Sequence, residues 1–141
     1  MKKTILFALI WVAAVACDQK QEAAPQSELK STSIPYRQLT TVATSGDNLK
    51  VELREVNDSR CPKNVVCIHM GSAQVKFNVS DGTNQTDVNL TFKGDKNADF
   101  QTFALSGVNY VIRVSEILPY PDTTQSPKLE DYKVNVTIEK K

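Results

Sequence analysis

Two cysteines, the single histidine of the chain and one of its two methionines gather in the segment DSRCPKNVVCIHMG, residues 58–71. Three kinds of chemistry suit such a cluster: a structural disulfide, a redox-active dithiol, or a soft-ligand site for Cu(I). A copper site would draw its ligands from Cys61, Cys67, His69 and Met70. The choice depends on the compartment in which the segment folds, because disulfides persist in oxidising surroundings.

The opening residues, MKKTILFALIWVAAVAC, indicate export from the cytoplasm. A basic start, an apolar run from Ile5 to Ala16 and small residues before Cys17 are typical of a secretory signal peptide. As a helix the apolar run would rise only about 18 Å, which is too short to span a bilayer. We therefore predict a signal peptide over residues 1–16.

Cys17 indicates how the mature chain is attached to a membrane. The residues before it would also suit an ordinary signal peptidase, but AVAC resembles a bacterial lipobox, whose cysteine is lipidated and becomes the first residue. The resemblance implies a diacylglycerol and an acyl chain such as palmitate on Cys17, and more than one chain is what stable anchoring needs. We expect a lipoprotein of the bacterial cell envelope, at the periplasmic face or at the cell surface.

Residues 17–34 are rich in Gln, Ala, Ser and Lys and contain few large apolar side chains, so they read as a lipid-anchored flexible tether. The random-coil reach of such a tether is about 20–25 Å. Loss of Lys2 and Lys3 with the leader takes the formal net charge from +1 to −1. A chain of this charge is not expected to bind nucleic acid.

Residues 35–141 show a period of two in their apolar side chains, which predicts half-buried antiparallel strands. Asp81-Gly82 and Ser106-Gly107 are turn signals that predict hairpins. We favour a single immunoglobulin-like antiparallel β-sandwich with Greek-key connections, and the alternative is a small β-barrel. The seven strands expected are 39–43, 49–56, 73–79, 86–92, 100–105, 108–117 and 132–138.

With Cys17 lipidated, Cys61 and Cys67 remain as an even pair in an oxidising compartment, so we predict a disulfide between them. Adjacent residues on a strand point to opposite faces, so His69 and Met70 could not both reach one ion. The C-x5-C spacing also lacks the helix N-terminus that activates a redox pair. No metal or other cofactor is predicted, and periplasmic copper binding through His69 and Met70 is the alternative.

The stretch DSRCPKNVVC, followed by Gly71 and an alternating strand, resembles an uncharacterised family of bacterial secreted and lipoprotein domains. The later LPYPDTTQSPKLEDYKVNV is similar to that family's closing Pro-Tyr-Pro loop and Glu-Asp-Tyr strand. The resemblance covers about residues 39–138 and implies a compact β-domain, but it brings no known activity with it. His69-Met70 stand where the family commonly has Trp-Ala, so a metal role built on them would be peculiar to this protein.

Four polar residues belong to these two motifs: Asp58, Arg60, Glu130 and Asp131. They could form a polar recognition site, or Arg60 could pair with a carboxylate and fix the cysteine loop against the last strand. We favour the structural role, because a planar guanidinium gains most where it meets two carboxylate oxygens together.

Signatures of catalysis are missing from the sequence, which has one histidine and no nucleophile elbow or phosphate loop. The stretch DKNADF from Asp95 begins like a calcium loop but has Phe100 at the sixth position and Ser106 at the twelfth, so we expect a surface turn. We predict a non-catalytic binding or structural module that meets a protein, a glycan or a small ligand through its loops. An inhibitor of proteases acting through residues 119–127 is a further alternative.

Overall fold

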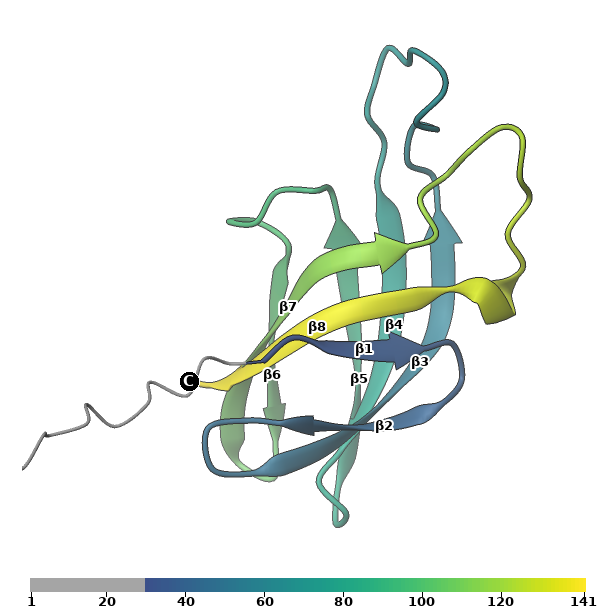
Figure 1. Ribbon diagram of the computed structural model, residues 1–141. Helices are drawn as coiled ribbons and strands as arrows, with labels where there is room; N and C mark the ends of the chain where they lie inside the picture. Colours follow the sequence, from purple (N-terminus) through teal and green to yellow (C-terminus); the bar gives the residue numbers. More distant parts are fainter. Residues whose placement is uncertain (1–29) are drawn as a thin grey trace, which may run out of the picture.

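Eight strands and one short 3-10 helix make up the part of the chain that the computed structural model describes, residues 30–141 (Figure 1). The expected signal peptide, Cys17 and most of the expected tether lie outside these residues. The helix η1 spans Leu129–Asp131 and precedes the last strand. The strands are β1 (Thr32–Pro35), β2 (Leu39–Ala43), β3 (Asn48–Asp58), β4 (Ala73–Ser80), β5 (Gln85–Phe92), β6 (Phe100–Leu105), β7 (Val108–Leu118) and β8 (Lys133–Lys140).

The strands form two four-stranded antiparallel sheets, in the orders β1-β8-β7-β6 and β2-β3-β4-β5. None of the described strands pairs with a strand of the other sheet. The predicted β-sandwich is therefore confirmed, and the described strands do not close into the small barrel that was the alternative.

The connections between strands are those of a meander. Strands that pair follow one another in the sequence, except for β1 and β8, and the chain passes between the sheets from β1 to β2 and from β5 to β6. The Greek-key connections that we expected are not what this strand order shows. Alternation reports which residues are half-buried but not which strands pair, whereas the two predicted hairpins, β4–β5 and β6–β7, are confirmed.

Strand β1 is the eighth strand, which the sequence pattern did not indicate. Its residues pair with β8, with Thr32 opposite Val136 and Ile34 opposite Val134, and the side chain of Ile34 is fully buried. The folded domain therefore begins before residue 35, inside the segment assigned to the tether. Four residues that end in a proline are too short to display a period of two.

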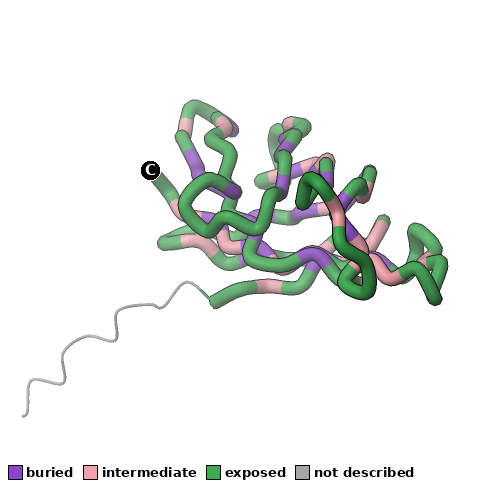
Figure 2. The backbone as a smooth tube through the Cα atoms, turned by 90° about the horizontal axis from the view of Figure 1, so that it is seen from above, coloured by how far each residue is buried: buried purple, intermediate pink, exposed green. Residues whose placement is uncertain are grey.

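The core lies between the two sheets, and strands such as β4, β5 and β8 bury every second side chain. Figure 2 shows this alternation as buried and exposed segments along the strands, while the connecting loops are mainly exposed. Burial of apolar side chains in such a layer is the main stabilising term for a domain of this size. The largest fully buried side chains are Phe77, Ile34, Leu49, Leu53, Ile112, Ile117 and Ile138.

Two long connections project from one end of the sandwich (Figure 1). One joins β3 to β4 and contains the cysteine pair, and we call residues 59–72 the disulfide loop. The other joins β7 to η1, and we call residues 119–128 the proline loop. The turn between β4 and β5 lies at the opposite end of these strands. No helix within the described range is long and apolar enough to cross a membrane.

Candidate functional site

The two arms of the disulfide loop continue the pairing of β3 with β4 beyond the ends of the strands. The amide of Ser59 donates to the carbonyl of Ser72 at 2.9 Å, and the amide of Cys61 donates to the carbonyl of Met70 at 2.8 Å. Gly71 has a φ of +69°, and a Cβ atom there would lie 2.1 Å from the carbonyl oxygen of Ser59. Only glycine allows the arms to approach this closely.

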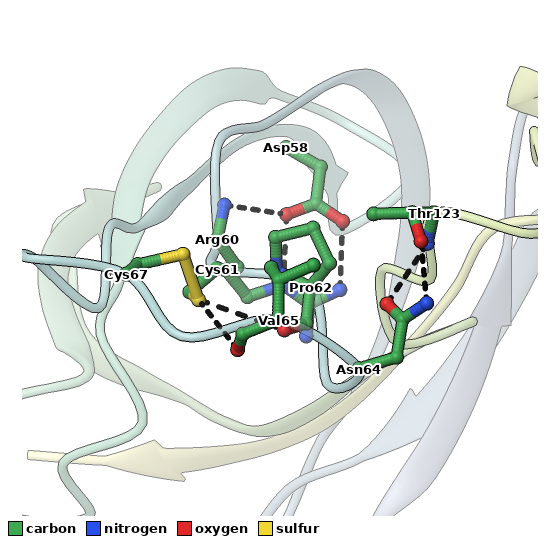
Figure 3. Close-up of a disulfide and its surroundings, with 8 residues drawn as sticks. All are labelled: Asp58, Arg60, Cys61, Pro62, Asn64, Val65, Cys67 and Thr123. Atoms are coloured by element: carbon green, nitrogen blue, oxygen red, sulfur yellow. Dashed lines mark hydrogen bonds and ion pairs between the residues drawn. A yellow bond between two sulfur atoms is a disulfide. The ribbon is translucent and has the colours of Figure 1, made fainter.

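A disulfide joins Cys61 and Cys67 within the loop, with their Cα atoms 6.0 Å apart, as Figure 3 shows. The predicted disulfide is therefore confirmed. Because both sulfur atoms are used in this bond, they cannot serve as the thiolate ligands of the alternative copper site. Among residues 30–141, no group of three or more His, Cys, Asp or Glu side chains could hold a metal ion.

Arg60 and Asp58 form a buried two-point ion pair at the base of the loop (Figure 3). Arg60 Nε donates to Oδ1 of Asp58 and Nη2 donates to Oδ2, both at 2.8 Å. Each side chain is only 5% exposed. Charges buried to this degree must be paired and hydrogen-bonded, and the two parallel bonds satisfy both oxygens of the carboxylate.

The remaining contacts of Arg60 attach the loop to the other sheet. Nη1 donates to the carbonyl of Ile117 in β7 at 3.0 Å, and Nη2 donates to the carbonyl of Pro119 at 3.1 Å. The guanidinium lies between two rings, 5.8 Å from the centre of Phe92 and 4.9 Å from that of Tyr120. One side chain therefore joins β3, β5, β7 and the proline loop.

Asp58 also accepts a hydrogen bond from the hydroxyl of Tyr132, the residue that precedes β8, at 3.2 Å. Burial by itself would raise the pKa of Asp58, but the hydrogen bonds and the charge of Arg60 outweigh it and hold that pKa below its usual value. Burial and the nearby Asp58 carboxylate raise the pKa of Tyr132. The contact with the closing segment is therefore a hydroxyl bond from Tyr132 to Asp58 at the end of β3, and not a direct pair between Arg60 and a carboxylate of that segment.

The disulfide loop is also held against the proline loop. The amide of Lys63 donates to the carbonyl of Pro121 at 3.0 Å, and its Nζ lies 3.6 Å from Asp122. The side-chain amide of Asn64 bonds to Thr123 through both its nitrogen and its oxygen, and Figure 3 shows the two side chains facing each other. These contacts order residues 63 and 64, which lie between the two bonded cysteines.

Apolar side chains occupy the outside of the disulfide loop. Val66 is 102% exposed, Ile68 is 96% exposed and Met70 is 68% exposed, and His69 between them is exposed as well. Single exposed apolar residues are common on protein surfaces, whereas contiguous exposed apolar patches are typical of interaction surfaces in general. This surface was not among the expected sites, although the apolar run VVCIHM, in a segment without strand periodicity, is a sequence signal for it.

Glu130 and Asp131 do not join the polar cluster. Both lie in η1 and are exposed, and the carboxylate of Asp131 accepts a bond from the amide of Lys128 at 2.9 Å. The cluster therefore consists of Asp58 and Arg60 from the predicted set, with Tyr132 and Tyr120 in addition. His69 and Met70 are neighbours on the exposed part of the loop.

The segment that begins like a calcium loop forms a turn between β5 and β6. Asp95 Oδ1 accepts the amide of Asn97 at 2.9 Å, and Asp99 Oδ1 accepts the amide of Lys93 at 2.8 Å. These acidic side chains satisfy the backbone of the turn, as expected for a surface turn.

Comparison of the chain with protein-family models, with curated proteins and with solved structures gives no match.

Proposed function

We propose that this protein is a lipid-anchored, non-catalytic binding module of a bacterial cell envelope, and that the tip of the disulfide loop is its contact surface. The tip consists of Val65, Val66, Ile68 and Met70. The observation that carries the proposal is the exposure of Val66 and Ile68, which are almost fully accessible on a loop that is otherwise held in place. The partner is a protein with an apolar depression that accepts a convex tip.

The contacts at the base of the loop support binding because they limit the conformations of the tip. The disulfide, the Arg60 ion pair and the bonds of Asn64 to the proline loop all act on the free protein. A loop ordered before binding loses less entropy when it binds, so more of the contact energy becomes affinity. The polar groups of these contacts bond to one another within the protein. They are therefore better suited to holding the loop in place than to catalysis.

Site-specific photocrosslinking in the native cells tests the contact surface. A photoreactive amino acid at position 66 should give a discrete crosslinked product with a partner protein, and Ile68→Ser in the same chain should reduce it. The matched control carries the same group at Thr83, an exposed residue in the turn at the opposite end of the domain. Equal crosslinking from both positions, or none from position 66, would contradict the proposed surface.

The anchor is tested separately. Cys17→Ser should prevent incorporation of labelled palmitate and move the protein from the membrane fraction to the soluble fraction, because the acyl chains supply the attachment. Labelling that persists in Cys17→Ser would show that the lipid is elsewhere. A chain that is unlabelled before mutation would contradict the lipoprotein assignment while leaving the crosslinking result intact.

A further inference from the structure

A groove of about 760 Å³ crosses the outer face of strands β3, β4 and β5, away from the disulfide loop tip. Its floor comes from the halves of these strands that lie toward the loop end of the domain. There β3 has no neighbour on its other side, because β2 pairs with β3 only from Asn48 to Glu52. The volume lies within the range of small-ligand sites.

The floor consists of two rows of polar side chains. Glu55, Lys76 and Asn89 are register partners across the three strands, and Asn57, Gln74 and Thr91 form the next row. These side chains alternate with the buried Val75 and Leu90, so they point away from the core. Neighbouring strands are about 4.8 Å apart, so each row spans about 10 Å.

Aromatic rings stand at both ends of the groove. Tyr36 lies at the β3 side with Leu129, and Phe100 lies at the β6 side. Phe100 as a whole residue is 42% exposed, and the guanidinium of Arg113 lies 5.1 Å from the centre of its ring. The cation holds the ring in place from one side and leaves apolar surface available to a ligand.

The charges of the floor largely cancel. Nζ of Lys76 lies 4.0 Å from the carboxylate of Glu55, and the other floor residues are amides and a hydroxyl. Such a surface has no excess charge to attract an anion, and it offers donors and acceptors side by side. This pattern complements a neutral ligand with many hydroxyl groups.

Asp99 adds an acceptor in the wall of the groove. It is 2% exposed, its Oδ1 accepts the amide of Lys93, and its Oδ2 has no hydrogen-bond partner among the described residues. A buried acceptor without a partner destabilises the free protein. Because that oxygen is enclosed by protein, a ligand hydroxyl reaches it only when the side chain of Asp99 turns toward the groove.

We propose that this groove binds a short stretch of a neutral polysaccharide. The amides of Asn57, Gln74 and Asn89 bond to sugar hydroxyls, and the apolar face of a sugar ring packs on Phe100. The groove includes no residue of the disulfide loop tip, and its binding would not use the lipid anchor, so the proposal does not depend on the function proposed above.

Affinity electrophoresis of the full chain, as its cells process it, tests the proposal. Native gels contain one dissolved polysaccharide each: dextran, xylan, mannan or mixed-linkage β-glucan, with anionic polygalacturonate for comparison. At least one neutral polysaccharide should slow migration. Phe100→Ala should raise the apparent dissociation constant by about tenfold, the size of effect that an aromatic contact contributes.

Asn89→Ala should also weaken retardation, and Asn78→Ala is its matched control. Asn78 lies on the same outer face of β4 but does not line the groove. If Phe100→Ala lowers the melting temperature, the test rests on the retardation of Asn89→Ala, because the side chain of Asn89 is exposed and its removal should leave the fold intact. Migration unchanged by all four neutral polysaccharides, retardation by polygalacturonate alone, or equal retardation of Asn89→Ala and the wild type would overturn the proposal.

Discussion

The disulfide loop and the groove face arrange polarity in opposite ways. In the loop, the charges of Asp58 and Arg60 are buried and the apolar side chains of Val66 and Ile68 are exposed. On the groove face, Glu55 is exposed and Lys76 is half-buried above an apolar core. The face follows the ordinary pattern of a half-buried sheet, whereas the loop reverses it.

Under the proposed function, the reversal separates the residues that stabilise the fold from those that contact a partner within a few positions. The buried ion pair contributes to the fold only while both partners are present, and the exposed tip contributes little to the fold. On the groove face the polar side chains also contribute little to stability, because water replaces their contacts. The two surfaces should therefore respond very differently to equivalent substitutions, and four measurements compare them.

Arg60→Met should have the largest effect and lower the free energy of unfolding by about 3–5 kcal/mol, because it leaves Asp58 buried without a counterion. Urea unfolding followed by circular dichroism measures the change. The matched variant is Lys76→Met on the groove face, whose partner Glu55 is 72% exposed at a distance of 4.0 Å, and we expect it to cost less than about 1 kcal/mol. Equal costs for the two variants would show that the loop pair is not the anchor described above.

Removal of the disulfide should have the next largest effect. Cys61→Ser combined with Cys67→Ser opens a loop with a sequence separation of 6, and the chain-entropy model gives a cost of about 2 kcal/mol. Unfolding of the wild type in reductant should show the same loss. A cost near zero would mean that Arg60 and the bonds to the proline loop hold the disulfide loop without a covalent link.

Acid should weaken the loop through Asp58. Burial raises the pKa of Asp58, but the hydrogen bonds and charge of Arg60 lower it by a larger amount. The pKa of Asp58 in the folded state therefore lies below its value in the unfolded state. The unfolded state then binds more protons, and the contribution of Asp58 is present above its unfolded pKa and is lost as the pH falls through its folded pKa.

The comparison that isolates this effect is the wild type against Asp58→Asn, from about pH 5 down to about pH 1. The stability difference between them should shrink as the pH falls. Asp81 and Asp122 also have lowered pKa values, from bonds to nearby backbone and hydroxyl groups, but they are present in both proteins. A difference that stays constant with pH would contradict the ion pair.

Most of the fold could be predicted because a half-buried strand has a local signature. Phe77 and Val79 are two residues apart and both are buried, as period two requires. The pairing of β1 with β8 has no such signature, since it joins residues about a hundred positions apart through a four-residue strand. Strand order is also a non-local property, which is why the expected Greek-key connections were not found.

The contacts of the candidate site also divide into local ones that the sequence could predict and distant ones that it could not. The disulfide was predictable from composition and compartment, and Asp58 lies only two residues from Arg60, so the pair forms locally. The carbonyl of Ile117 is 57 residues from Arg60, and a backbone acceptor leaves no trace in the sequence. Glu130 shares a motif with the closing strand, but Arg60 is already satisfied by the nearer carboxylate.

Substitutions at the tip should have the smallest effect on stability. Val66→Ser combined with Ile68→Ser should change the free energy of unfolding by no more than about 0.5 kcal/mol, because both side chains are exposed before and after unfolding. Asn89→Ala on the groove face should change the free energy of unfolding by a similarly small amount. The tip variant removes apolar groups, whereas the groove variant removes a polar one. A loss well above this value at the tip would mean that Val66 and Ile68 pack against the folded domain. Their exposure would then no longer distinguish the loop from the groove face, and the case for a contact surface there would fail.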